Sequence, residues 1–442
     1  MHRALFHKIS QMKRTRNMCI DNKVVETTMA VISTPTRTTI FNPTTKKRSV
    51  KPINAHKTKR ILIREFEKDY TTSCSASSSL HKTPTESDNL TESKTTETYN
   101  SYISATDNKT DLCWRSLNVG TKELFLDLTF PTGQTFRWRE TGPTCGPSEY
   151  TGVIGVHLFT LRQVGDEVKY FIHGRGGQSE EEQRAVLNDY LNLGISLKDM
   201  WNKFVQVDSR FAALAPYMGG ARLLRQDPLE CLFQFICSSN NNIKRITQMV
   251  EYLSSFGPYL GTVDGTYFHA FPSLKELSSV TEGQLRAAGF GYRAKYIVET
   301  VKALNSKNTG GNEWLLSLRN LPLEESMEAL CTLPGVGPKV ASCIALFSLD
   351  QHHAIPVDTH VWQIAMQYIT PELSGEHLTP KLSQKVSEAF VTKFGKYAGW
   401  AQTVLFISEL SSQQAILPQH LRTVKEPKVK TKHKKGSVKD RD

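Results

Sequence analysis

The segment Leu333-Pro334-Gly335-Val336-Gly337-Pro338-Lys339-Val340-Ala341 decides the fold of this 442-residue chain. Residues 326–331 before it are typical of the end of a helix, and apolar residues after it recur at helical spacing. The two glycines allow a tight hairpin between these helices, and Pro338 suits the first position of the second helix. Backbone N–H groups near such a helix N-terminus bind phosphate without reading base sequence. The segment therefore predicts a helix, a glycine hairpin and a second helix.

Lys339 and Asp358 are the candidate catalytic residues. Lys339 falls in the first turn of the second helix, where the helix dipole and partial burial would push its amine toward neutrality. A neutral amine is a nucleophile. Asp358, in Ile355-Pro356-Val357-Asp358-Thr359-His360, precedes an apolar helix over 361–368, which it could cap while its carboxylate faces Lys339. Each feature alone is more often structural than catalytic, but the two together favour a nucleophilic lysine beside a carboxylate.

These two segments resemble the helix–hairpin–helix motif, Gly/Pro-rich loop and aspartate of the base-excision DNA glycosylases, in which a lysine marks the bifunctional members. Four further strings extend the resemblance over about 111–415. They are Arg-Leu-Leu-Arg-Gln-Asp-Pro-Leu-Glu-Cys-Leu-Phe, Ser-Ser-Asn-Asn-Asn-Ile, Gly-Tyr-Arg-Ala-Lys-Tyr and Ala-Gly-Trp-Ala-Gln. Together they resemble the eukaryotic 8-oxoguanine DNA glycosylases specifically.

The resemblance implies the chemistry of the site. Lys339 would attack the deoxyribose C1′ of a nucleotide flipped out of duplex DNA, Asp358 would stabilise positive charge on the sugar, and the Schiff base would permit β-elimination. The Gly133 carbonyl, in Pro-Thr-Gly-Gln-Thr-Phe-Arg-Trp-Arg, would accept a hydrogen bond from the N7–H that 8-oxoguanine has and guanine lacks. Losing such a buried bond costs about 1–3 kcal/mol.

The resemblance also implies a base pocket and a DNA-contacting surface. The remaining predicted base-binding residues are Cys343, Pro356, Gln402 and Phe406. The residues expected to contact the opposite cytosine or the surrounding DNA are Asn240, Arg245, Tyr292, Arg293, His360, Gly335 and Gly337. The chain departs from the family pattern at three positions: Pro338 where threonine or lysine is frequent, Ser342 for an acid, and Phe347 for a methionine near the pocket. The last difference would change the pocket size.

The predicted fold is α+β. Residues 111–215 are expected to form an antiparallel β-sheet with flanking helices, TBP-like by the resemblance, and 216–415 a mostly α-helical domain. Alternating apolar residues predict a half-buried strand over 122–130 that resumes at 134–138. A β-hairpin is predicted over 153–172. The predicted helices cover residues 178–193, 197–205, 227–237, 243–256 and 398–406.

The net charge of +12 is concentrated at the ends of the chain. Residues 1–110 carry 19 basic and 10 acidic side chains, and 418–442 carry 9 and 3, which leaves 27 and 30 for 111–417. Residues 1–110 and 416–442 are expected to be disordered basic extensions. The first 20 residues are typical of either a mitochondrial presequence or a merely basic end. We expect a nuclear protein, with the mitochondrion as a second location.

No cofactor or metal is expected. The eight cysteines contain no Cys-x₂-Cys pair, and no cysteine follows Cys343, which excludes the four-cysteine iron–sulfur cluster of some relatives. No apolar run has membrane-spanning length, so no membrane contact is expected. The expected partner is damaged double-stranded DNA, bound by a monomer, with downstream repair proteins as further partners.

Two alternatives stay open. The first is a glycosylase for a different oxidised base, such as an oxidised pyrimidine. The second is a non-catalytic helix–hairpin–helix DNA-binding module, which would need the glycines but has no use for Lys339 and Asp358 together. A P-loop or dinucleotide-binding loop is excluded, because the chain has no G-x-x-x-x-G-K-[ST] segment and the hairpin lacks a third glycine.

Overall fold

The computed structural model describes residues 114–142, 146–174 and 179–423. The expected N-terminal extension lies outside these ranges. The expected C-terminal extension was placed to begin at 416, and this boundary is wrong. Residues up to Thr423 are ordered, because α18 (Ser411–Ile416) is followed by a 3₁₀ turn at Gln419–Leu421, and Leu417 and Leu421 are buried. In the described ranges, no helix combines the length and apolarity needed to cross a bilayer.

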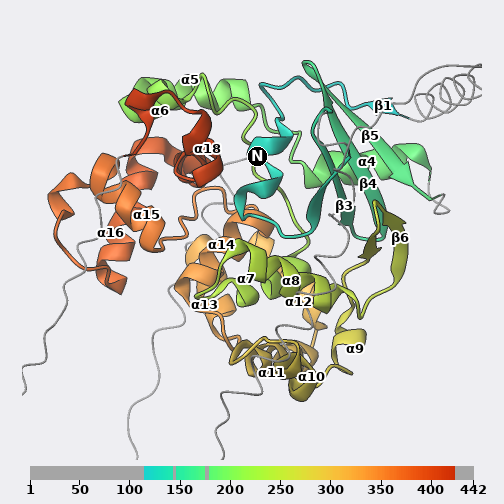
Figure 1. The fold of residues 1–442 in the computed structure, drawn as a ribbon. Coiled ribbons are helices and arrows are strands. Elements are labelled where there is room, and N and C mark those ends of the chain that lie inside the picture. Colours follow the sequence, from blue (N-terminus) through green and yellow to red (C-terminus); the bar gives the residue numbers. More distant parts are fainter. Residues whose placement is uncertain (1–113, 143–145, 175–178, 424–442) are drawn as a thin grey trace, which may run out of the picture. The chain divides into compact units, whose positions relative to one another are not determined.

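The sheet has five antiparallel strands in the order β1-β5-β4-β3-β2 (Figure 1). The strands are β1 Arg115–Ser116, β2 Trp138–Thr141, β3 Glu149–Ile154, β4 His157–Val164 and β5 Glu167–His173. The predicted hairpin is confirmed as β4 and β5, where Val164 pairs with Glu167 across a turn at Gly165, which has a φ of 57°. The register places Leu161 opposite Tyr170, and both side chains are buried.

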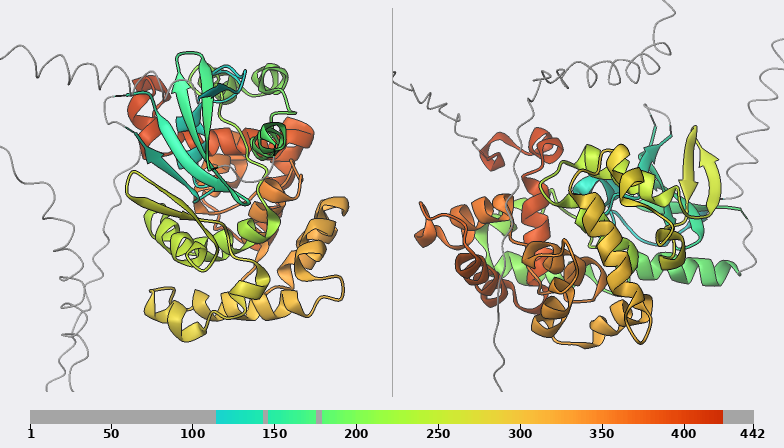
Figure 2. Two further views of the ribbon diagram at one scale, coloured as in Figure 1. Left: turned by 90° about the vertical axis from the view of Figure 1, so that its right-hand side faces the viewer. Right: turned by 90° about the horizontal axis from the view of Figure 1, so that it is seen from below.

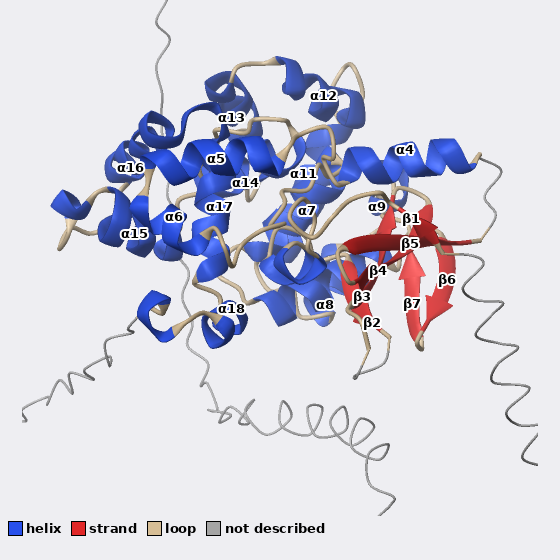
Figure 3. Ribbon diagram, turned by 90° about the horizontal axis from the view of Figure 1, so that it is seen from above, coloured by secondary structure: helices blue, strands red, loops and turns tan. Residues whose placement is uncertain are grey.

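Helix α4 (Glu180–Tyr190) packs against this sheet, as Figure 3 shows. It begins with a capping box made by Ser179 and Glu182. Its Leu187 and Tyr190 belong to the core under the sheet, where the indole Nε1 of Trp138 donates to the Tyr190 hydroxyl at 3.0 Å. The antiparallel sheet with a flanking helix is confirmed.

The predicted strand over 122–130 is wrong. The segment forms two 3₁₀ turns, Leu126–Leu128 and Phe130–Thr132. Its four alternating apolar side chains are buried, but Leu124, Leu126 and Phe130 enter the core under the sheet, whereas Leu128 enters the helical core. The segment therefore lies between two hydrophobic cores, and its alternating pattern does not reflect a strand with one buried and one solvent-exposed face.

Most of the remaining chain is helical. The α-helices are α5 Leu197–Val207, α6 Ser209–Leu214, α7 Pro228–Ser238, α8 Ile243–Ser254, α9 Leu274–Leu277, α10 Glu282–Ala287, α11 Arg293–Asn305, α12 Gly311–Ser317, α13 Leu323–Cys331, α14 Pro338–Ser348, α15 Thr359–Ile364, α16 Pro380–Phe394 and α17 Ala398–Ser408. Helix α15 continues as a π-helical turn, Ala365–Ile369. Helix α7 is buried from Pro228 to Cys237 and packs against α14.

Helices α5 and α6 share the helical core. The ring of Phe204 on α5 lies 5.4 Å from that of Phe394 on α16, and Phe211 on α6 contacts both rings. The core containing these residues also contains most of α7, α14 and α17. The hydrophobic core therefore does not divide at residue 215, where the sequence placed a domain boundary.

A second, two-stranded sheet was not predicted. Strands β6 (Tyr259–Val263) and β7 (Thr266–His269) form a hairpin that packs on the main sheet through Phe268, against Val153 and Leu158 (Figure 2). Asp264 and Gly265 both have positive φ, 46° and 72°. This Asp-Gly pair between two β-prone runs was the signal that could have revealed the hairpin.

Candidate active site

The glycine hairpin between α13 and α14 has the predicted form. Gly335 has a φ of +78°, and a Cβ added there would lie 2.7 Å from the Cβ and Cγ atoms of Tyr296 on α11. Thr300, one turn further on α11, donates to the Pro334 carbonyl at 2.8 Å. Gly337 caps α14 with a φ of −102° and faces open space, since a Cβ there would have no neighbour within 4 Å. Gly335 therefore shapes the hairpin, and Gly337 leaves the helix N-terminus accessible.

Lys339 is the second residue of α14 and is half-buried, with its Nζ 5.6 Å from the centre of the Phe235 ring. Burial lowers the pKa of Lys339, but Cys343 and Asp358 raise it by more, so the pKa lies above its usual value. The expectation of a neutral amine is therefore wrong for this arrangement. Burial is the largest single influence on this pKa, and it is outweighed only by Cys343 and Asp358 acting together. Lys339 must lose a proton before it can attack.

Cys343 lies one turn after Lys339 and is buried. Burial raises the pKa of its thiol, and the positive charge of Lys339 opposes this rise without cancelling it. The thiol is consequently neutral near pH 7. Cys343 and Asp358 both lie close enough to Lys339 to raise its pKa.

Asp358 both caps a helix and faces Lys339. It precedes α15, and its Oδ1 accepts hydrogen bonds from the backbone N–H groups of His360 and Val361 at 2.9 and 3.0 Å. These two bonds fix the orientation of the carboxylate. Asp358 and Lys339 also line the same cavity. Asp358 therefore caps α15 and lies near Lys339 at the same time.

This cavity collects all the residues predicted to bind the base. Its volume is about 70 Å³. Its lining consists of Thr132, Gly133, Gln134, Phe235, Lys339, Cys343, Phe347, Pro356, Asp358, Val361, Gln402, Thr403 and Phe406. These residues come from the turn before β2 and from α7, α14, α15 and α17 and the segments beside them. Ligand sites usually measure about 300–1,000 Å³, so the cavity must widen to admit a purine.

Aromatic rings form part of the wall. Phe347 stacks on Phe235 with ring centres 5.6 Å apart and planes 14° from parallel. Phe406 is half-exposed, and its ring lies 6.3 Å from that of His360, which is exposed at the start of α15. Sequence reasoning missed Phe235, because an apolar residue on a helix that is buried all round carries no sign of facing a cavity.

Gln402 is the most informative residue in the lining. It is only 4% exposed, yet none of the described residues forms a hydrogen bond with its side-chain amide. Buried amides are almost always hydrogen-bonded. An unpartnered amide that lines a cavity is available to bind the polar edge of a ligand there.

Four of the predicted DNA-contacting residues lie where α7 ends and α8 and α11 begin, whereas Gly335 and Gly337 precede α14 and His360 is in α15. Asn240 is exposed with a φ of +48°, and the Arg245 Nη2 donates to the Gly289 carbonyl at 2.8 Å. Tyr292 is exposed, and its hydroxyl donates to the Ser239 carbonyl at 3.0 Å. The structure thus brings these segments together.

Arg293 differs from its expected placement, since it is 2% exposed. Its Nη2 donates to the Ser239 carbonyl and, at 3.0 Å, to that of Asn240, while its guanidinium lies 4.6 Å from the centre of the Tyr292 ring. In this arrangement Arg293 holds the asparagine turn from inside rather than offering its guanidinium to DNA.

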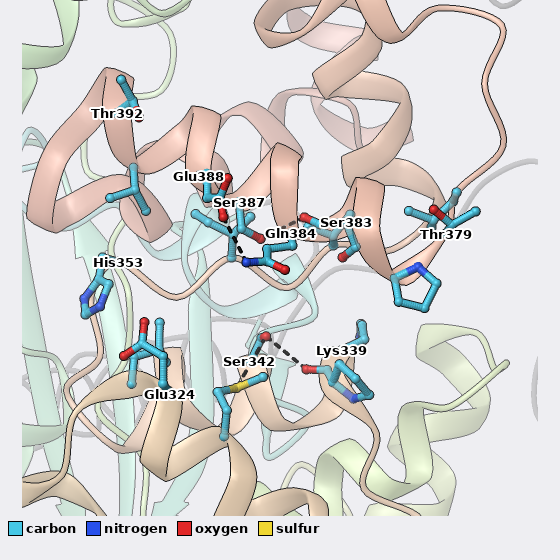
Figure 4. Close-up of a pocket in the computed structure, with 18 residues that line it drawn as sticks. Glu324, Lys339, Ser342, His353, Thr379, Ser383, Gln384, Ser387, Glu388 and Thr392 are labelled. Atoms are coloured by element: carbon cyan, nitrogen blue, oxygen red, sulfur yellow. Dashed lines mark hydrogen bonds between the residues drawn. The ribbon is translucent and has the colours of Figure 1, made fainter.

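A larger cavity of about 750 Å³ lies on the other side of Lys339, between α16 and the α13–α14 pair (Figure 4). Ser383, Gln384, Ser387 and Glu388 of α16 line one wall, with Gln384 donating to Glu388 at 2.9 Å. Lys339 is the only predicted site residue in its lining, which lacks Gly133, Asp358 and Gln402. The smaller cavity, not this one, therefore contains the residues expected to act on the base and the sugar.

Among the described residues, no group of three or more His, Cys, Asp or Glu side chains could hold a metal ion.

Two family models match the chain. Residues 116–232 match the N-terminal domain of 8-oxoguanine DNA glycosylase, and residues 233–390 match the HhH-GPD superfamily of base excision DNA repair proteins. The solved 8-oxoguanine glycosylase/lyase of Clostridium acetobutylicum, in complex with double-stranded DNA containing cytosine opposite 8-oxoguanine, is similar with a TM-score of 0.56 and 29% identity. The match covers 64% of this chain and 91% of that one.

Two curated relatives are similar over most of their length. The N-glycosylase/DNA lyase OGG1 of Arabidopsis thaliana is 60% identical over 306 residues, which cover 69% of this chain and 82% of the relative. The N-glycosylase/DNA lyase of Saccharomyces cerevisiae is 37% identical over 328 residues, 66% of this chain and 85% of the relative. The chain therefore belongs to the eukaryotic 8-oxoguanine DNA N-glycosylase/lyase family, within the helix–hairpin–helix base-excision superfamily.

Proposed function

We propose that this protein excises 8-oxoguanine opposite cytosine from duplex DNA and cleaves the strand at the resulting abasic site. The observation that carries the proposal is one cavity in which the unpartnered amide of Gln402 and the Gly133 turn lie with Lys339 and Asp358. The first two residues can recognise a base, and the last two can act on its sugar. Family membership favours this enzyme over a non-catalytic DNA-binding module.

The base is recognised after it has been flipped out of the duplex. The Gly133 carbonyl accepts the N7–H of 8-oxoguanine, which guanine cannot donate, and the Gln402 amide bonds the Watson–Crick edge. Cys343 and Phe406 hold the two faces of the purine, and Pro356 completes the pocket. Since the cavity measures about 70 Å³, the half-exposed Phe406 is the wall that has to move to admit the base.

The chemistry begins with the loss of a proton from Lys339. Its Nζ then bonds to C1′ while the bond from C1′ to the base nitrogen breaks, and the electron pair of that bond leaves with the base, which takes up a proton. Asp358 stabilises the positive charge that develops on the sugar, because its carboxylate is held in place by two backbone N–H groups. Opening of the sugar ring yields a Schiff base, and loss of a C2′ proton then expels the 3′-phosphate.

The opposite cytosine is read at the start of α8 and α11. Asn240 and Arg245 are exposed and can bond its edge, and Tyr292 can enter the base stack. Arg293 can reach the cytosine only by exchanging its bonds to the Ser239 and Asn240 carbonyls. Gly335 and Gly337 present the α14 N-terminus to a phosphate, and the exposed His360 side chain can contact the flanking phosphate.

The proposal includes a monomeric enzyme in the nucleus, and also in the mitochondrion, which hands its product to downstream repair proteins. The test of the proposed function is single-turnover excision from duplexes that carry 8-oxoguanine opposite each of the four bases. A preference for cytosine is expected. Equal rates opposite all four bases would overturn the functions given to Asn240, Arg245, Tyr292 and Arg293. A panel that includes oxidised pyrimidines decides the lesion, and faster excision of a pyrimidine would favour the alternative substrate.

A further inference from the structure

We infer that three buried glutamines, Gln134, Gln226 and Gln234, form a hydrogen-bonded chain that holds the Gly133 carbonyl in position relative to Lys339. Gln226 joins the two walls of the pocket. This inference rests on the proposed function of Gly133 and adds positioning residues to it. None of the three glutamines was identified by sequence reasoning, because a glutamine within an apolar segment usually serves only to satisfy backbone groups.

The side chain of Gln134 ties the Gly133 turn to the segment before α7. Its Nε2 donates to the carbonyls of Thr129 at 2.8 Å and Arg222 at 2.9 Å, and its Oε1 accepts from the Leu224 N–H at 2.9 Å. Gly133 itself has a φ of +83° and immediately precedes Gln134. The left-handed residue that is expected to recognise the lesion is therefore clamped by its neighbour rather than by bonds of its own.

Gln226 links this turn to the helix that carries the nucleophile. Its side-chain Nε2 donates to the Gln134 carbonyl at 2.6 Å, and its backbone N–H donates to the Phe347 carbonyl of α14 at 2.8 Å. Gln226 is 1% exposed. A single buried residue thus spans from the recognition turn to α14, which also supplies Lys339, Cys343 and Phe347 to the pocket.

Gln234 fixes the orientation of the Gln226 amide. Its Nε2 donates to the Gln226 Oε1 at 3.1 Å, so the Gln226 nitrogen must face the Gln134 carbonyl. The Gln234 Oε1 in turn accepts from the Phe136 N–H at 2.7 Å. Gln234 is fully buried on α7, next to Phe235 in the pocket wall. The direction of the Gln226 amide is thus set by Gln234, and that of the Gln234 amide by the Phe136 N–H.

Such an arrangement matters because recognition depends on the position of one carbonyl. Hydrogen bonds weaken steeply with distance and angle, and preorganised acceptors act without reorganisation at the moment of reaction. Buried amide chains are also stiff, because breaking one bond leaves both partners unsatisfied away from water. How well the Gly133 carbonyl discriminates between a donor and an acceptor at N7 therefore depends on how firmly the three glutamines fix its position.

The test compares two reactions of the full-length enzyme. Base excision from an 8-oxoguanine:cytosine duplex needs the Gly133 carbonyl, whereas strand cleavage at a preformed abasic site needs Lys339 but no base recognition. Gln226→Met keeps the side-chain length and the backbone bond to Phe347 but loses the amide. We expect roughly tenfold slower excision, the effect of one lost buried hydrogen bond, with abasic-site cleavage within about twofold of wild type.

Gln351→Met is the matched control. Gln351 is also a buried glutamine, and its Nε2 donates to the Leu321 carbonyl at 2.9 Å, outside the pocket. Gln351→Met should change thermal stability about as much as Gln226→Met does, and it should leave the ratio of the excision rate to the abasic-site cleavage rate unchanged. Gln234→Met should lower the ratio as Gln226→Met does, and it replaces that variant if Gln226→Met does not fold. In the Gln226→Met/Gln234→Met double variant, the loss should be no greater than in the more affected single variant.

Equal loss of both reactions in the Gln226→Met or Gln234→Met enzymes, or no loss in either, would overturn the inference. Failure of the proposed function looks different, because the wild-type enzyme itself would then fail to excise 8-oxoguanine while it still cleaved abasic sites.

Discussion

Lys339 and Asp358 lie at the N-termini of two different helices, α14 and α15, and both face one cavity of about 70 Å³. The positive ends of both helix dipoles are directed at this region, where they favour an anion and disfavour a cation. Asp358 is accordingly bound by two N–H groups. The pKa of Lys339 is nevertheless raised, because Cys343 and Asp358 together outweigh burial, so the lysine must lose a proton before attack.

Replacing Asp358 by asparagine separates its charge from its capping. Asparagine can still accept the His360 and Val361 N–H bonds, but Asp358 is one of the two residues that raise the pKa of Lys339, and its charge is lost. The pKa of Lys339 should then fall, and borohydride trapping on preformed abasic DNA should reach its half-maximal rate at a lower pH than in wild type. Excision of 8-oxoguanine should be largely lost.

Asp358→Ala is the comparison, since it also removes the cap and should destabilise the fold by about 0.5–2 kcal/mol. An unchanged or higher midpoint in Asp358→Asn would contradict the charge assignment.

The two hairpin glycines should respond differently to alanine. Gly335→Ala places a side chain at a φ of +78° and 2.7 Å from Tyr296, so it should lower the melting temperature. Gly337→Ala meets neither a positive φ nor a neighbour, so the melting temperature should stay within the error of wild type. Its methyl group would instead stand where a phosphate approaches the α14 N-terminus, and the affinity for duplex DNA should fall. Thermal melts and DNA titrations of both variants check this. A stable Gly335→Ala protein would show that the hairpin tolerates a side chain.

Gln402 is expected to contribute to activity and not to the stability of the fold. Because its amide lines the cavity without a protein partner, Gln402→Leu removes no bond of the fold and should leave its stability unchanged or raise it by up to roughly 1 kcal/mol. Excision of 8-oxoguanine should fall because the edge of the base loses its partner. Gln351→Leu is the matched control, since its amide does bond the Leu321 carbonyl and its loss should destabilise the fold. Urea unfolding and single-turnover excision measure the two effects. Destabilisation by Gln402→Leu would mean that its amide serves the fold.

The catalytic segment was predictable because its residues restrict the backbone locally. Gly335 needs its left-handed φ, Pro338 starts α14, and Asp358 caps α15, and none of these depends on distant contacts. The direction of the Lys339 pKa shift was not predictable, because it depends on how burial in the folded chain balances against Cys343 and Asp358, the latter 19 residues away.

Two further errors have the same origin in long-range contacts. Segment 122–130 has the alternation of a strand, but only the folded chain places one core on each side of it. The resemblance led us to expect Arg293 at the DNA-contacting surface, whereas three backbone carbonyls accept hydrogen bonds from its buried guanidinium. Neither arrangement leaves a mark in the local sequence.

Glu230 should make the stability of the fold depend on pH. It is buried on α7, and burial raises its pKa to about 7. Arg137, whose Nε lies 3.2 Å from the Glu230 Oε1, opposes this rise but does not cancel it. Asp227, at the N-terminus of the same helix, adds to the rise.

The sign of the effect follows from proton uptake. Between the unfolded pKa of 4.5 and the folded pKa of about 7, the folded protein binds a proton that the unfolded chain does not. The contribution of Glu230 to stability is therefore full below about pH 4.5 and is lost as the pH rises to about 7, by up to roughly 3 kcal/mol at 1.4 kcal/mol per unit. The residue introduced by Glu230→Gln cannot titrate, so the free energy of unfolding of this variant should rise relative to wild type from pH 5 to pH 7 and then level off.

Glu251→Gln, which removes the exposed partner of Arg139, is the control, and its free energy of unfolding should follow the same pH dependence as that of wild type. Urea titrations at pH 5, 6, 7 and 8 measure the difference. A constant offset between Glu230→Gln and wild type over that range would show that Glu230 is ionised throughout in the folded protein and that Arg137 compensates its burial in full.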